Sequence, residues 1–84
     1  MITQETVESM EGRDDLVAFI RTLRCSLTDN PSSWENADLM TYLDALAAWI
    51  EDMDGYFRNR GEAVPERPSW QLLAQMLSAA RVYE

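Results

Sequence analysis

The 84-residue sequence contains no histidine, no lysine and only one cysteine, Cys25. Without histidine the chain lacks an imidazole general base, a Ser-His or Cys-His couple and a histidine ligand for zinc. A single cysteine forms neither an intrachain disulfide nor a thiolate cluster, which is typical of proteins from the reducing cytoplasm. We therefore expect a cytoplasmic protein that is not an enzyme and that binds no metal or cofactor.

Basic residues are also few, since seven arginines face 15 acids and leave a formal charge of −8. Nucleic-acid binding draws most of its affinity from lysine and arginine contacts to phosphates, so we expect no nucleic-acid ligand. The same charge opposes binding to anionic membranes. The longest apolar run, Ala45–Ile50, is far shorter than the about 20 residues of a membrane-spanning helix. Residues 1–10 also lack the basic residues of a signal peptide.

Three stretches of the chain show the apolar spacing of amphipathic helices. The first covers residues 13–28 and has its apolar face at Leu16, Ile20, Leu23 and Leu27. Gly12 is the expected N-cap, and two acids fall in the first turn, where the helix dipole favours them. Pro31 ends this helix because proline disfavours helical geometry at the preceding residue, and it can open a short helical turn.

The second stretch has the strongest pattern and predicts a buried seam at Leu39, Leu43, Leu46, Ile50, Met53 and Phe57. A neighbouring stripe, spaced by seven, consists of Tyr42, Trp49 and Tyr56. Asn36 is the expected N-cap. The helix can end at Gly55 or at Gly61. We favour Gly61, because the seam continues beyond Gly55 to two arginines that suit a helix C-terminus.

The third stretch follows the loop 61–68, begins after Ser69 as N-cap and runs to about residue 83, with apolar positions Trp70, Leu73, Met76, Leu77, Ala80 and Tyr83. No segment alternates with period two, so no strand is expected. The pattern predicts an all-α fold, a small three-helix bundle formed by a single domain over residues 13–84. Residues 1–12 show no period and are expected to form a loosely ordered N-terminal arm.

Several short blocks of the sequence match a known family. They are WEN at 34–36, DMDGYF at 52–57, PSW at 68–70 and AARVYE at 79–84. Through them, nearly the whole chain from Asp14 onward resembles the small bacterial family known as domain of unknown function 7660. The resemblance implies a bacterial, cytoplasmic, stand-alone domain, and it implies no activity.

Asp52, Asp54 and Gly55 are similar to part of an EF-hand loop, in which acids occupy positions one, three and five and glycine occupies position six. With Gly55 at position six, Ile50 stands at position one and Gly61 at position twelve. An EF-hand requires an acid and a glutamate at those two positions. The pattern therefore does not predict a calcium site.

These acids have structural explanations on a helix. Asp54 precedes Arg58 by four residues and is expected to be a solvated charge paired with it. Asp52 lies one turn from both Trp49 and Tyr56, which predicts an acceptor for an indole N–H, a phenol O–H or the amino end of the third helix. Binding of a partner is the alternative role for both acids.

The three tryptophans are numerous for such a short chain. Trp49 and Trp70 are expected in the core, because each large ring buries on the order of 200 Å². Trp34 precedes the second helix, where it can pack over a helix end or stand exposed as a binding anchor. Cys25 lies off the face of the first helix and has no histidine or lysine to activate it, so we expect an inert thiol.

These features favour a non-catalytic, acidic protein-interaction module. One form is an antagonist or immunity-type protein that covers a basic partner, since complementary charge raises the association rate. The expected partner-binding residues are Trp34, Glu35, Glu51, Asp52, Asp54 and Tyr56. The alternative is a structural, self-associating subunit, in which the helical seams of two copies complete a core as a homodimer. A chain this short buries only roughly 60% of its surface alone.

Overall fold

The structure, a computed structural model, describes residues 4–83 of the chain. This range contains the α-helices and one short 3-10 turn in the order α1 (Gln4–Glu8), α2 (Arg13–Asp29), η1 (Pro31–Ser33), α3 (Leu39–Asn59) and α4 (Trp70–Ala80). No strand occurs within the described range. The three long helices confirm the predicted all-α, three-helix fold.

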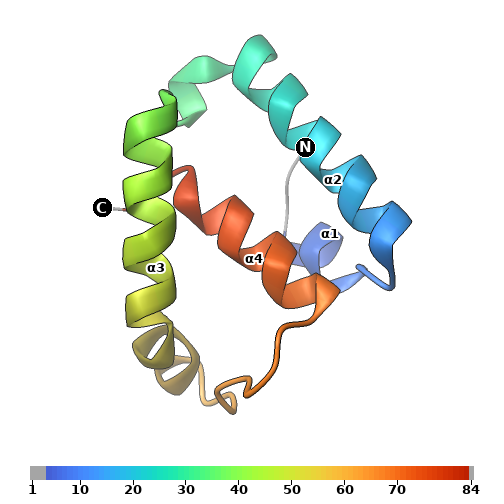
Figure 1. Cartoon of the computed structure of the whole chain (residues 1–84), viewed down its shortest axis with the longest axis vertical. Coiled ribbons are helices and arrows are strands. Elements are labelled where there is room, and N and C mark those ends of the chain that lie inside the picture. The colour runs from blue at the N-terminus through green and yellow to red at the C-terminus, as the bar shows by residue number, and fades with distance from the viewer. Residues whose placement is uncertain (1–3, 84) are drawn as a thin grey trace.

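The helix α4 crosses between α2 and α3 and packs against both of them (Figure 1). The short helix α1 also packs on α4. The backbones of α2 and α3 diverge and do not approach each other closely (Figure 1). The helix α4 is therefore the shared element of the core, and α2 and α3 keep sides that no other helix covers.

The helix ends largely follow the predicted capping pattern. Gly12 precedes α2, and the hydroxyl of Ser69 caps α4 by accepting a hydrogen bond from the amide of Leu72 at 3.0 Å. The helix α3 continues through Gly55, as favoured from the sequence. It stops before Gly61, whose φ of 71° lies in the left-handed region that favours glycine.

The predicted N-cap of α3 is wrong. Asp38, not Asn36, caps this helix, because its carboxylate accepts hydrogen bonds from the backbone amide and the hydroxyl of Thr41, each at 3.0 Å. These two bonds, the backbone one first, lower the pKa of Asp38 from its ordinary 3.8. Asn36 is two residues too early for this role and makes long-range contacts instead.

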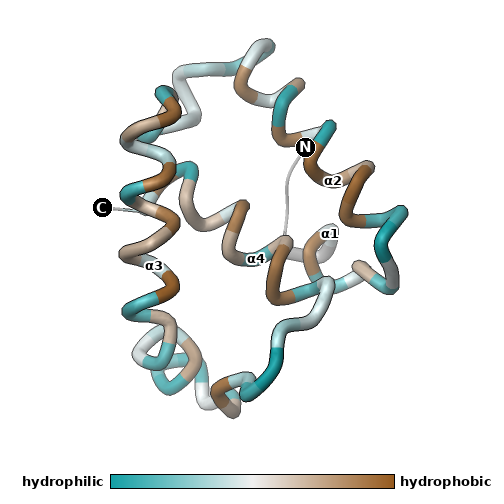
Figure 2. Tube along the Cα trace, viewed as in Figure 1, coloured by the Kyte–Doolittle hydropathy of each residue, from teal (hydrophilic) through white to brown (hydrophobic). Residues whose placement is uncertain are grey.

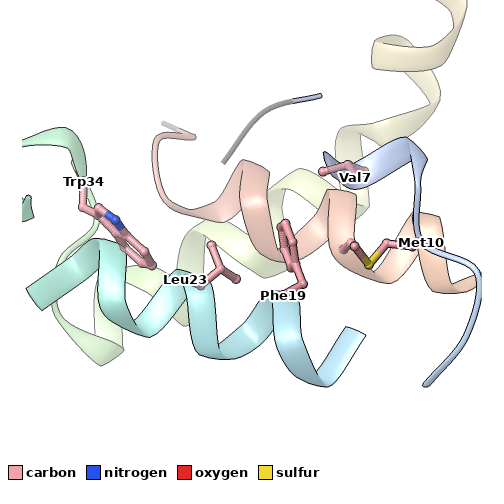
Figure 3. Close-up of a cluster of buried hydrophobic side chains, with 6 residues drawn as sticks. Val7, Met10, Phe19, Leu23 and Trp34 are labelled. Atoms are coloured by element: carbon pink, nitrogen blue, oxygen red, sulfur yellow. The ribbon is translucent and has the colours of Figure 1, made fainter. Parts of the chain in front are cut away.

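Two clusters of buried side chains form the core. The larger one joins α1, α2, α4 and the residue after η1, and consists of Val7, Met10, Phe19, Leu23, Trp34 and Ala74 (Figure 3). The smaller one joins the C-terminal half of α3 to α4 and consists of Trp49, Phe57 and Leu72. Trp49 is thus buried as predicted. Trp70, at the first position of α4, exposes 40% of its surface, so its predicted core position is wrong.

Part of the predicted N-terminal arm is helical and contributes to the core. Val7 and Met10 expose only 4% and 7% of their surfaces, and Gln71 of α4 donates a hydrogen bond to the carbonyl of Glu8 at 2.8 Å. Sequence analysis missed α1 because five residues are too few to show a helical period. Residues 1–3 of the arm lie outside the described residues, and the division of the chain at residue 12 stays a prediction.

The predicted buried face of α3 is wrong by about a quarter of a helical turn. The centre of the buried face is formed by Ala45 and Trp49, which expose 7% and 4% of their surfaces. In the predicted seam, Phe57 is buried and Leu46 and Met53 are half-buried, whereas Leu39, Leu43 and Ile50 expose 73%, 52% and 41% of their surfaces. The predicted aromatic stripe therefore packs on α4, and much of the seam remains exposed.

Candidate functional site

The divergence of α2 and α3 leaves an open groove of about 350 Å³, which we call the interhelical groove. Its lining is mostly apolar and includes Ile20, Leu23, Leu27, Trp34, Leu39 and Leu77. Two charged residues also line it, Arg24 from α2 and Asp38 from the start of α3. The groove is thus a hydrophobic depression with one charge of each sign at its walls.

Both walls of the interhelical groove continue in exposed apolar side chains, which we call the apolar ridges of α2 and α3. The ridge of α2 is Val17 and Ile20, exposed by 42% and 46%. The ridge of α3 is Leu39, Leu43 and Ile50, whose spacing of four and seven places them along one line of the helix. Figure 2 shows hydrophobic positions recurring along both helices. Apolar patches of this kind on a small protein mark binding surfaces.

The two ridges carry opposite charges. On α2, Arg13 precedes Val17 by four residues, and Arg24 follows Ile20 by four residues. The four side chains therefore lie along one line of the helix. Arg21 is exposed beside them. None of these three arginines makes an ion pair with any residue of the part of the chain described, 4–83. The ridge of α2 is therefore apolar in the middle and has an arginine at each end, of which Arg13 lies beside Glu11, Asp14 and Asp15.

The ridge of α3 shows the inverse pattern. Asp38 precedes it, and the exposed Glu51 and Asp54 follow at its other end. The predicted pair between Asp54 and Arg58 is wrong, because within residues 4–83 the structure contains no ion pair between them. The ridge of α3 is therefore apolar in the middle and negative at both ends.

Asn36 holds the segment after α4 against the start of α3. Its backbone amide donates a hydrogen bond to the carbonyl of Arg81 at 2.9 Å. Its side-chain amide donates to the carbonyls of Ala80 and Tyr83 at 3.0 and 2.8 Å. Carbonyls at the end of a helix have no partner within the helix. One asparagine therefore satisfies three carbonyls at the end of α4 and fixes one end of the interhelical groove.

Trp34 lies at the same end of the fold and is buried, with 9% of its surface exposed. Its indole N–H donates a hydrogen bond to the hydroxyl of Ser26 at 3.1 Å, and its ring stacks on Tyr42 with a centroid distance of 5.8 Å. The guanidinium of Arg81 lies over its ring, 5.9 Å from the centroid. Of the two roles considered for Trp34, packing over a helix end is the one it has, and its ring also lines the groove.

Asp52 is exposed, and its carboxylate accepts a hydrogen bond from the hydroxyl of Tyr83. This agrees with the predicted role as acceptor for a phenol O–H, although the phenol belongs to the segment after α4. The hydrogen bond to the carboxylate, followed by burial, raises the pKa of Tyr83 above its ordinary 10.0. The contact ties the side chain of Tyr83 to the C-terminal half of α3, while Asn36 holds the backbone carbonyl of the same residue.

We predict that Asp52→Asn lowers the pKa of the Tyr83 phenol towards 10.0, because the carboxylate that disfavours the phenolate is removed. Since folding raises this pKa, the contact stabilises the fold below pH 10 and its contribution is lost as the pH rises through the folded-state value. Phenolate absorbance measured against pH, with Tyr83→Phe to identify the transition, checks this. An unchanged transition in Asp52→Asn would contradict it.

The six predicted partner-binding residues differ in exposure: Trp34 is buried and Tyr56 half-buried, whereas the four acids are exposed. Trp34 and Glu35 precede α3, and the other four lie in its C-terminal half. Glu51 and Asp54 are exposed and border the apolar ridge of α3. Tyr56 is half-buried, since its ring packs on Trp49 and lies under the guanidinium of Arg60.

The part of the chain that the structure describes contains few side chains arranged to act as catalytic groups or metal ligands. Within residues 4–83, no three acidic or cysteine side chains are placed to hold a metal ion. Cys25 is exposed on α2. A second hollow, of about 310 Å³, is bounded by α1, the end of α3, the loop that follows it and α4. Its polar lining includes Glu8, Glu62, the phenol of Tyr56 and the capping Ser69. Over the same range, no helix is long and apolar enough to cross a bilayer.

Sequence analysis did not identify the interhelical groove, although a signal for it was present. Apolar side chains cover nearly half of the circumference of α3, an arc of about 160° from Ala45 through Trp49 to Leu43. A helix with one helical neighbour buries only one side. A helix that is apolar over a wider arc must therefore leave part of its apolar surface exposed or present it to a partner.

The fold and the groove define a small all-helical protein with an exposed apolar surface between two diverging helices. The chain belongs to the family of unknown function DUF7660, which matches residues 12–84. This confirms the resemblance seen in the sequence, and the matched range contains α2, α3, α4 and the whole interhelical groove. Comparison with curated proteins and with solved structures found no match.

Proposed function

We propose that this protein is a non-catalytic protein-interaction module that binds its partner in the interhelical groove. The observation that carries the proposal is the exposure of the two apolar ridges beside a mostly apolar groove. Burial of apolar surface is worth about 25 cal/mol per Å², so covering these side chains provides a driving force for association. No other surface with comparable apolar exposure lies on two helices within the part of the chain described.

The charge of the chain supports a partner that carries basic residues beside apolar ones. The protein has a formal charge of −8, and α3 carries four carboxylates against one arginine. Complementary charge at the rim of an interface raises the association rate and selects the partner. An antagonist or immunity-type protein of the bacterial cytoplasm, which covers a basic surface of its target, is one form of this proposal.

Substitution of a charged residue into the apolar ridge of α3, beside the groove, tests the proposal. Leu43 is 52% exposed, so Leu43→Arg should leave the fold intact while placing a charge in the apolar ridge. In capture experiments with tagged protein and extract of the source cells, we expect proteins retained by the wild type to be lost with this variant. Ala18→Arg, at an exposed position of α2 away from the groove, is the matched control and should retain them.

Retention of the same proteins by the wild type, Leu43→Arg and Ala18→Arg would contradict the proposed site. Circular dichroism of the three proteins is needed beside the capture experiment, because only variants with equal helicity report on binding. Identification of the retained proteins also shows whether the partner is another protein or an untagged copy of this chain.

A further inference from the structure

We propose that the interhelical groove is filled by a second copy of this chain, with α2 of each copy packed against α3 of the other. This inference rests on the proposed function and names the partner. It is supported by the two apolar ridges, the charges at their ends and the symmetry of the resulting contact.

The apolar ridges supply the centre of the contact. In the single chain, α2 and α3 each bury one side against α4 and leave the ridge uncovered. Val17 and Ile20 of one copy can pack against Leu43 and Ile50 of the other, because both sets lie along straight lines of exposed helices. Such a contact places apolar side chains on apolar side chains and removes both ridges from water.

The charges at the ends of the ridges select a second copy over an unrelated partner. The ridge of α2 ends in Arg13 and Arg24, about 17 Å apart along the helix. The ridge of α3 lies between Asp38 and Glu51, about 20 Å apart, a span that flexible arginine side chains can meet. The acids that border the ridge of α3 favour a partner with basic residues. The arginines of α2 in a second copy provide such residues.

A two-fold axis makes both contacts at once. In a dimer with two-fold symmetry, each contact between two different residues across the interface occurs twice, once in each direction. Packing of α2 on the partner's α3 thus implies packing of α3 on the partner's α2. Four helices, two from each copy, then surround the two grooves, and each α2 meets acids at both ends of its ridge.

Sedimentation of the wild type over a range of protein concentrations measures the dimer, and two single variants locate it. We expect a concentration-dependent dimer in the wild type. Leu43→Arg should raise its dissociation constant on the order of a hundredfold, because the arginine is placed in the apolar centre of the contact. Ala18→Arg should leave the dissociation constant unchanged.

Charge reversal tests the pairing of α2 with α3 directly. The double variant Arg13→Glu with Arg24→Glu, and separately Glu51→Arg with Asp54→Arg, should each weaken its own dimer about tenfold, because like charges then meet. A mixture of the two double variants should form a heterodimer that is tighter than either variant's own dimer, because one α2–α3 contact then has the native charges and in the other only Asp38 still meets a glutamate. All four positions are exposed, so unchanged helicity is expected.

Three results would overturn the inference. These are a wild type that stays monomeric at millimolar concentration, a dimer insensitive to Leu43→Arg, and double variants that fail to recover affinity when mixed. None of these results removes the proposed function, because capture of another protein that depends on Leu43 would still support it. The proposed function fails separately if Leu43→Arg changes neither the dimer nor the captured proteins.

Discussion

Replacing Phe19 by alanine is expected to reduce the free energy of unfolding by about 3 to 5 kcal/mol. Phe19 exposes 2% of its surface and is the largest fully buried side chain in the described part of the chain. It packs in the cluster that joins α1, α2 and α4, so its removal leaves a cavity at the contact of three helices (Figure 3). A chain of 84 residues is stabilised by only about 4 to 13 kcal/mol, so this loss is a large part of the total.

Urea unfolding followed by circular dichroism measures this effect. Cys25→Ala is the matched control, because Cys25 is exposed on the same helix and its replacement should change the free energy by less than about 0.5 kcal/mol. Phe19→Leu should keep more of the stability, since leucine fills part of the cavity. Equal unfolding midpoints for Phe19→Ala and Cys25→Ala would contradict the assignment of the core.

Replacing Asn36 by alanine is expected to cost about 1 to 3 kcal/mol. The side-chain amide donates hydrogen bonds to the carbonyls of Ala80 and Tyr83, and alanine leaves both carbonyls without this partner in a half-buried place. The backbone hydrogen bond to Arg81 does not depend on the side chain and is retained. The effect should therefore loosen the C-terminal segment without removing α4.

The control for this experiment is Asn59→Ala, an asparagine exposed at the end of α3, whose replacement should change the free energy by less than about 0.5 kcal/mol. Urea midpoints give the difference between the two variants. Tryptophan fluorescence adds a local measurement, because Trp34 packs under Arg81 in the segment that Asn36 holds. A stability loss no greater than that of Asn59→Ala would show that the segment is held by other contacts.

The long helices could be predicted from the sequence because their signals are local. Gly12, Ser69 and Gly61 stand at helix ends for reasons that depend on a few neighbouring residues, and the structure confirms all three. Asn36 looked like a cap for the same local reason, but Asp38 is closer to the first turn and has the partner Thr41. The short α1 gave no signal because a helical period needs more residues than it has.

The candidate site was less predictable than the helices. Periodicity shows that α3 is apolar over a wide arc, but it cannot show which part of the arc meets α4. The exposure of Leu39 and Leu43, and the burial of Ala45, follow from the side of α3 on which α4 packs. The groove itself exists because α2 and α3 diverge, which no local pattern encodes.

Sequence alone was sufficient for the all-helical class, for the excess of negative charge and for most ends of the long helices, although not for the start of α3 or the end of α4. These depend on residue types and on spacings within a few turns of one helix. Only the tertiary structure decided which ridges stay exposed, which end of α3 meets the C-terminal segment, and that Asn36 contacts Tyr83, 47 positions away. Contacts between distant segments depend on how whole helices pack, because each amphipathic helix has several ways to bury its apolar side.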